Sequence, residues 1–220
     1  MIKITNLCRN WGNFSISGVN LEVKAGEFFG LFGHNGAGKT LLLETIAGIW
    51  YPDKGEIFID SKNMTLLPPE KRNIGFVYQE PWLFPHLSVK ENICFGLRVR
   101  KRKKKEIERR IEELNVILKL DSVLLRKNTG LLSGGEKQKV SLARVLATNP
   151  GIIFCDEPTH SLDRQAREAF YKILSDIRKN FATVIVFVSH DYEELKDLAD
   201  RIGIMEEGRL VQVDGIIPRF

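Results

Sequence analysis

Two patterns of hydrophobic and polar residues divide this chain of 220 residues. From Ile2 to Val23, apolar and polar residues tend to alternate, which is typical of strands with one buried face. The segments GIIFCDE (151–157) and TVIVFVSH (183–190) are instead apolar almost throughout. Such runs indicate strands that are buried on both faces of a sheet. We therefore expect an antiparallel sheet near the N-terminus and a mostly parallel sheet further along.

Further short strands and helices complete the expected core. Strands between helices indicate a parallel sheet that is covered by helices on each side. A closing hairpin is expected over RIGIMEEGRLVQVDG, about Glu206-Glu207-Gly208. The other expected strands are 27–33, 55–60 and 72–79, and the expected helices are 40–48, 134–148, 163–179 and 191–200.

The pattern of hydrophobic residues changes between the expected strand at 72–79 and the expected helix at 134–148. A proline-punctuated stretch, EPWLFPHLSVKENI, leads into EIERRIEELNVILKL. In the latter, Ile107, Ile111, Leu114 and Leu118 lie at helical spacing on one face. We therefore predict a single domain over 1–220 with a helical subdomain inserted at about 81–135.

Composition excludes several classes of protein. Charged residues make up 28% and hydrophobic residues 43%, as in ordinary globular proteins. The net charge of +5 is too small to indicate nucleic acid by itself. Cys8, Cys94 and Cys155 show neither disulfide nor zinc spacing, which fits a reducing cytosol. No apolar run approaches the length that crosses a bilayer, so any membrane connection is expected through a partner.

Much of the positive charge lies in RVRKRKKK, residues 98–105. The run has no interleaved aromatics and leads into an amphipathic helix, which favours a solvated helix start. A contact with the anionic inner leaflet of the membrane is the alternative.

The segment GHNGAGKT matches the phosphate-loop pattern G-x-x-x-x-G-K-[ST] and follows an expected strand. In such a loop, glycines let backbone N–H groups face an anion while the lysine reaches the outer phosphates. The helix that follows would add its N-terminal dipole. The predicted phosphate-binding residues are Gly33, His34, Asn35, Gly36, Ala37, Gly38, Lys39 and Thr40. The threonine hydroxyl would also hold Mg²⁺.

Two further motifs suit nucleotide chemistry. Asp156 and Glu157 end a buried strand, where parallel sheets place their ligands. We expect Asp156 to order the Mg²⁺ shell and Glu157 to act as a general base on water. In LSGGE, Ser133 can cap a helix, while Gly134 and Gly135 leave its backbone open to a phosphate.

In their order along the chain, these residues resemble the ATP-binding cassette (ABC) ATPases, the nucleotide-binding subunits of ABC transporters. The resemblance covers essentially the whole chain. It implies an α/β P-loop NTPase core, an N-terminal antiparallel β subdomain and an inserted helical subdomain, with ATP and Mg²⁺ as cofactors. It also implies a Q-loop at Gln79, which would contact the metal and take part in catalysis, a D-loop at 161–163 and a switch histidine at His190.

The resemblance further implies a head-to-tail homodimer. The phosphate loop of one copy and the LSGGE helix of the other would enclose one ATP. Ser133 and Gly134 would donate to the γ-phosphate across the interface, His190 would contact it within the subunit, and Asp163 would face the partner.

The segment around Gln79 resembles ATPases of importers for molybdate, tungstate and sulfate. This implies integral membrane permease subunits as partners, a solute-binding protein acting through the permease, no nucleic acid, and a peripheral location on the cytoplasmic face of the membrane. Trp82, Leu83 and Phe84 either receive the permease or pack the helical subdomain internally. No regulatory domain is expected after Phe220. The alternative function is a soluble ABC-type ATPase that acts as a nucleotide-gated binding module on DNA or ribosomes.

Two positions depart from the usual pattern of the family. Trp11 stands where relatives often have a tyrosine or phenylalanine that stacks on adenine. The other interpretation of Trp11 is an edge-strand aromatic packed on the core. Lys137-Gln138-Lys139 stands where relatives often have glutamine and arginine, so no phosphate contact is expected from these side chains.

Overall fold

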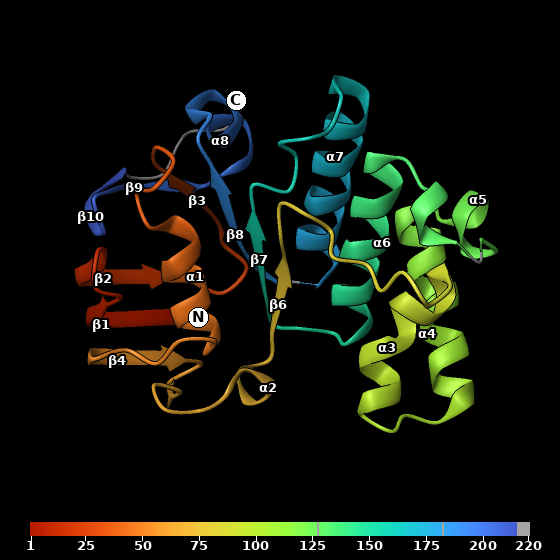
Figure 1. Cartoon of the computed structure of the whole chain (residues 1–220), viewed down its shortest axis with the longest axis horizontal. Helices are drawn as coiled ribbons and strands as arrows, with labels where there is room; N and C mark the ends of the chain where they lie inside the picture. Colours follow the sequence, from red (N-terminus) through yellow and green to blue (C-terminus); the bar gives the residue numbers. More distant parts are fainter. Residues whose placement is uncertain (127, 182, 215–220) are drawn as a thin grey trace. The chain divides into compact units, whose positions relative to one another are not determined.

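The computed structural model describes residues 1–126, 128–181 and 183–214. It divides into two compact units, and each is described by itself. The first comprises Met1–Ile74, Gly151–Glu157 and the chain from Phe181 onward, and the second comprises Gly75–Pro150 and Pro158–Asn180. The helical subdomain expected at about 81–135 falls within the second unit, and its exact bounds stay a prediction. Figure 1 labels the elements.

The N-terminal part of the first unit is an antiparallel sheet of order β2-β1-β4-β5. Along β2, buried and more exposed residues alternate, with Ile16, Val19, Leu21 and Val23 buried. The alternation that predicted this sheet is thus confirmed along β2 from Val19 to Val23, where every second residue is buried. The strands are β1 (Ile2–Asn10), β2 (Ser15–Val23), β4 (Lys54–Ile59) and β5 (Lys62–Asn63).

A mixed second sheet forms the core of the first unit. Its strands in this unit run in the order β10-β9-β3-β8-β7. All neighbours are parallel except β10, which pairs antiparallel with β9 in the expected hairpin. Every residue of β7 and β8 is buried, as their continuous apolar runs predicted. The bounds are β3 (Phe28–Phe32), β7 (Ile152–Asp156), β8 (Val184–Ser189), β9 (Arg201–Glu206) and β10 (Arg209–Asp214).

Within the described part of the first unit, three helices accompany these sheets. The helix α1 (Lys39–Ala47) follows the phosphate loop, α2 (Pro69–Arg72) is a single turn, and α8 (Tyr192–Leu198) packs on β3 and β8. The apolar face expected in α1 is confirmed, because Leu42, Leu43, Ile46 and Ala47 are all buried.

The second unit is mainly helical. It begins after Ile74, the first residue of the short strand β6 (Ile74–Val77). Within it, α3 packs against α6 and α4. The helices are α3 (Val89–Val99), α4 (Lys104–Leu118), α5 (Asp121–Leu124), a 3-10 turn (Thr129–Leu131), α6 (Gly134–Ala147) and α7 (Arg164–Phe181), whose last residue belongs to the first unit.

The helix α3 was not predicted as a separate element. It begins at a capping box in which the Ser88 hydroxyl accepts from the backbone of Glu91 and the Glu91 carboxylate accepts from the backbone of Ser88. This reciprocal pair satisfies two N–H groups at the helix start.

Among the described residues, no helix has both the length and the apolar character needed to span a membrane.

A buried arginine joins α2 to α1 in the first unit. Arg72 is only 1% exposed. Desolvation by burial lowers its pKa. Its guanidinium nitrogens lie 2.8–3.1 Å from the backbone oxygens that they donate to. These oxygens belong to Thr45, Ile46, Thr65 and Leu67.

Replacing Arg72 by Met is expected to lower the free energy of unfolding by about 2–4 kcal/mol, because several buried carbonyls lose a charged donor at once. Urea titration followed by circular dichroism would measure it. The neighbouring Lys71→Met serves as the control, because that side chain is exposed and its removal should change stability by less than about 0.5 kcal/mol. Equal stability of the two variants would contradict the anchoring role.

Candidate functional site

The predicted phosphate loop connects β3 to α1, in the strand, loop and helix order that the motif requires. Gly36 has φ 82° and Gly38 has φ 97°, both in the left-handed region that favours glycine. A Cβ on Gly38 would also lie 2.7 Å from the Phe14 ring. A Cβ on Gly36 would meet none of the described residues within 4 Å. The loop therefore has an open backbone at its tip, where a ligand can approach.

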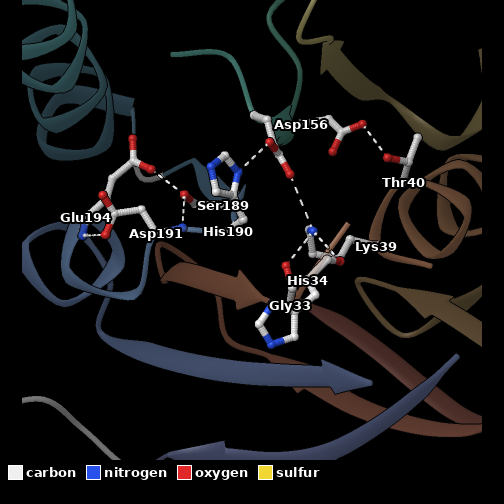
Figure 2. A network of polar contacts seen from close by, with 10 residues as sticks. Gly33, His34, Lys39, Thr40, Asp156, Ser189, His190, Asp191 and Glu194 are labelled. Atoms are coloured by element: carbon white, nitrogen blue, oxygen red, sulfur yellow. Dashed lines mark hydrogen bonds and ion pairs between the residues drawn. The ribbon is translucent and has the colours of Figure 1, made fainter. Parts of the chain in front are cut away.

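Lys39 lies beneath this loop and is 5% exposed. Its Nζ donates to the carbonyl of Gly33 at 2.6 Å and to that of His34 at 3.1 Å. The same atom lies 3.3 Å from Oε1 of Glu157. Because a buried charge needs paired partners, these three oxygens hold the ammonium in place. Figure 2 shows its contacts with Gly33 and His34.

Thr40 and Asp156 meet at the end of β7. The threonine hydroxyl donates to Oδ2 of Asp156 at 2.7 Å. Burial raises the pKa of Asp156 above its usual value, and the hydrogen bond from Thr40 opposes this only in part. A buried carboxylate beside a hydroxyl is a pair of hard oxygen donors, which suits a small divalent cation.

Glu157 is the next residue and has an unusual backbone. Its φ of 44° is in the left-handed region, which costs a non-glycine residue energy and is often retained at functional sites. Its side chain is 13% exposed. Oε2 lies 2.8 Å from Nδ1 of His190, while Oε1 faces Lys39. The carboxylate is thus held between a cation and an imidazole.

The loop after β8 positions His190 through residues that the sequence analysis did not single out. The Ser189 hydroxyl donates to the carboxylate of Glu194 and accepts from the backbone of Asp191 at 2.9 Å. The Asp191 side chain caps α8 by accepting from the backbone of Glu193 and Glu194. Figure 2 shows this network next to His190. An Asp followed by two glutamates is a local helix-start signal, which could have identified Asp191.

A groove of about 1030 Å³ adjoins the tip of the phosphate loop. It is lined by the turn at 13–15, by the loop residues 34–37 and by the hairpin about Glu207. Trp11 lies just before that turn. Its ring meets Trp50 edge-on, with 6.2 Å between centroids, and the Arg9 guanidinium lies 5.6 Å from it. Since Trp11 is half-buried, both interpretations of this residue stay open.

The LSGGE motif lies in the second unit and starts α6. Ser133 and Glu136 form a capping box, with Ser133 accepting at 3.2 Å and Glu136 accepting at 2.8 Å. Gly134 is exposed, and a Cβ on it would meet no atom closer than 3.8 Å. A Cβ on Gly135 would lie 3.0 Å from that of Ala166. The helix start is therefore capped and has an open backbone at Gly134.

Gln138, which departs from the usual family pattern after the LSGGE motif, has a structural role. It is 1% exposed, and its amide nitrogen lies 2.7–3.2 Å from the carbonyls of Tyr78, Gln79 and Pro158. It therefore fixes the backbone at Gln79, whose own side chain is exposed. Asp163 caps the start of α7, where its Oδ1 accepts from the backbone of Ala166 at 2.8 Å.

Trp82, Leu83 and Phe84 differ in their surroundings, and a contact with the permease stays a prediction. Trp82 is 69% exposed. It lines a groove of about 470 Å³ together with Leu83. Phe84 packs inside the second unit, with its ring 4.6 Å from that of Phe95 and under the Arg144 guanidinium.

The first unit thus brings together five of the predicted site residues from distant parts of the sequence: Lys39, Thr40, Asp156, Glu157 and His190. Gln79, Ser133, Gly134, Gly135 and Asp163 belong to the second unit.

Comparison with known proteins places this chain in a family. The family model described as ABC transporter matches residues 16–160, more than half of the chain. A molybdate/tungstate import ATP-binding protein from Pyrococcus horikoshii is 41% identical over 98% of this chain and 62% of its own length. A sulfate/thiosulfate import ATP-binding protein from Nocardia farcinica is 41% identical over 97% of this chain and 64% of its own length. The chain therefore spans less than two thirds of these relatives.

Solved structures agree with this assignment and with the α/β fold that was predicted. The subunit cbiO1 of the ABC transporter complex cbiONQ from Clostridium perfringens has a TM-score of 0.88 and 29% identity, covering 97% of this chain and 88% of that one. A dimeric ATP-binding cassette with bound ADP and inorganic phosphate has a TM-score of 0.86 and 30% identity, and each chain is covered fully. This chain belongs to the ABC transporter family and has the fold of its ATP-binding cassettes.

Proposed function

We propose that this chain is the ATP-binding and ATP-hydrolysing subunit of an ABC importer. The observation that best supports this function is the arrangement around Glu157, whose two carboxylate oxygens face the ammonium of Lys39 and the imidazole of His190. A carboxylate, an ammonium and an imidazole beside a glycine-rich loop suit the hydrolysis of a nucleoside triphosphate.

Each side chain has a distinct task in this mechanism. Lys39 neutralises the outer phosphates after it exchanges the loop carbonyls for phosphate oxygens. Glu157 accepts the proton of the attacking water at a carboxylate oxygen. His190, whose Nδ1 lies against the Glu157 carboxylate, contacts the terminal phosphate and so orients it toward the attacking water. The separation of roles follows from their positions at the ends of neighbouring parallel strands.

The donor set at Thr40 and Asp156 fits Mg²⁺, because a hydroxyl and a buried carboxylate lie in contact there. When bound, the ion would neutralise charge on the nucleotide phosphates. Gln79 is a further proposed ligand, based on the family resemblance alone.

We propose that two copies pair head to tail and share each nucleotide. The open, capped helix start at Ser133 and Gly134 is suited to a phosphate, and a dimeric cassette is among the similar structures. Under this arrangement Asp163 faces the partner copy. Loss of the γ-phosphate then removes the ligand that favours the closed dimer.

The permease is the proposed membrane partner, and it docks on the surface at Trp82 and Leu83.

An oxyanion such as molybdate, tungstate or sulfate is the proposed cargo, because the relatives described above are named as import ATP-binding proteins for these ions. The same similarity does not favour a role on DNA or ribosomes. The peripheral location on the cytoplasmic face of the membrane is part of this proposal.

The test is reconstitution. The chain, its co-purifying membrane subunit and the solute-binding protein are placed in proteoliposomes, and ATP hydrolysis and uptake are measured with each oxyanion. We expect hydrolysis to rise when the correct oxyanion is present. An ATPase-active chain that enriches no membrane protein would contradict the importer role, and a folded chain with no ATP turnover in any assembly would contradict the enzymatic role.

Trp11→Ala is expected to weaken MgATP binding by about ten- to a hundredfold, since base–aromatic stacking contributes about 1–3 kcal/mol. Isothermal titration with ATP measures this loss. Trp82→Ala is the matched control and should leave ATP affinity unchanged. If Trp11→Ala binds ATP as the parent does, Trp11 only packs against Trp50 and the adenine role is wrong.

A further inference from the structure

The turn between α3 and α4 has an unusual density of positive charge. Seven of the eight residues at 98–105 are lysine or arginine, and all seven are exposed. The solvated helix start expected here is only part of the structure, because α3 ends at Val99 and α4 begins at Lys104. The run therefore spans one helix end, a turn and the next helix start, and Figure 1 shows α3 and α4 joined by this turn.

Few carboxylates offset this charge. Arg98 lies 3.5 Å from Glu91, and Lys104 lies 3.9 Å from Glu108. Within the described part of the chain, the other five cations of the run form no ion pair. Exposed pairs at such distances are weak. A strong positive potential thus remains at this end of the second unit.

A groove of about 730 Å³ adjoins the run and extends the same charge. Four cationic side chains line it, against the two carboxylates already named. Burial raises the pKa of the Cys94 thiol in its wall, so this thiol is neutral near pH 7 and adds no negative charge. The four cations are Lys90, Arg98, Arg102 and Lys104.

An exposed apolar residue on this surface favours a bilayer over a nucleic acid. Val99, the second residue of the run and flanked by Arg98 and Arg100, is 65% exposed. An aliphatic side chain surrounded by lysine and arginine suits the boundary between headgroups and acyl chains. Single-stranded nucleic acids instead need aromatic platforms on which bases stack, and the run contains none.

We propose that this basic surface, formed by Lys90 and the cations of 98–105, binds the headgroups of anionic phospholipids at a membrane surface. The opposite charges provide the attraction, and the groove accommodates a headgroup. This contact goes beyond the proposed function and does not depend on ATP turnover or on a permease.

The test is co-sedimentation of the purified chain with vesicles of phosphatidylcholine, with or without phosphatidylglycerol. We expect binding only to the anionic vesicles, weakening steeply as salt is added. Each lysine or arginine near such a surface strengthens binding by roughly fivefold. The triple variant Arg102→Gln, Lys103→Gln, Lys105→Gln should therefore bind about a hundredfold more weakly than the parent.

The control variant Lys62→Gln, Lys71→Gln, Lys172→Gln removes the same charge from exposed positions elsewhere, and should retain most of the binding. Melting temperatures of both variants check that folding is intact. Equal loss in the two variants, or equal binding of the parent to neutral vesicles, would overturn the proposal. So would a competition in which RNA displaces the vesicles, since the surface would then be a nucleic-acid site.

Discussion

Glu157→Gln is expected to reduce ATP turnover by about two to four orders of magnitude, the usual contribution of a general base, while leaving MgATP binding close to that of the parent. An amide cannot accept the proton of water as a carboxylate does. The replacement is nearly isosteric, so the contacts with Lys39 and His190 can persist as hydrogen bonds. Phosphate release measures the turnover, and titration calorimetry measures the binding.

The same variant tests the shared site. If two copies enclose the nucleotide, Glu157→Gln should accumulate as a dimer in MgATP, as seen by light scattering during gel filtration. The control is Glu22→Gln, which also removes one negative charge but at an exposed position of the same unit. It should hydrolyse ATP at the parent rate and show no such accumulation. Parent-level turnover in Glu157→Gln would remove the residue from its role, and a strictly monomeric complex with ATP would exclude the head-to-tail dimer.

Lys39→Met should lose nucleotide affinity by about ten- to a hundredfold, because hydrogen bonds to charged groups contribute about 1.5–3 kcal/mol. Its ammonium contacts the carbonyls of Gly33 and His34 and the carboxylate of Glu157, so it already lies beside the phosphate loop. Calorimetric titration with MgATP gives the dissociation constant.

Lys62→Met, an exposed position on β5, is the control for loss of a lysine. A melting experiment on both variants separates lost binding from lost folding, since Lys39 also partners a nearly buried carboxylate. An unchanged dissociation constant in folded Lys39→Met would refute the phosphate role. Lys39→Met is thus expected to fail at binding, whereas Glu157→Gln is expected to fail after it.

Local patterns predicted most of the elements. The phosphate loop, β3 and α1 follow one another within a short stretch, so their order could be inferred from periodicity and glycine spacing. The helix α3 was not predicted separately because it follows a proline-punctuated stretch, although its Ser88–Glu91 capping box is a local signal. The extent of β6 was overestimated, since α2 ends at Arg72 and Asn73 takes a left-handed φ of 51°.

The sequence by itself determined the order of the motifs and the secondary structure that presents each one, because periodicity, caps and glycine spacing are properties of neighbouring residues. Only the tertiary structure decided which atoms meet. Parallel pairing of β3, β8 and β7 brings their carboxyl ends to one edge of the sheet, so Lys39, Glu157 and His190 come into contact although they are far apart in sequence. Burial of Arg72 and Gln138 likewise depended on packing between distant segments, which no local pattern encodes.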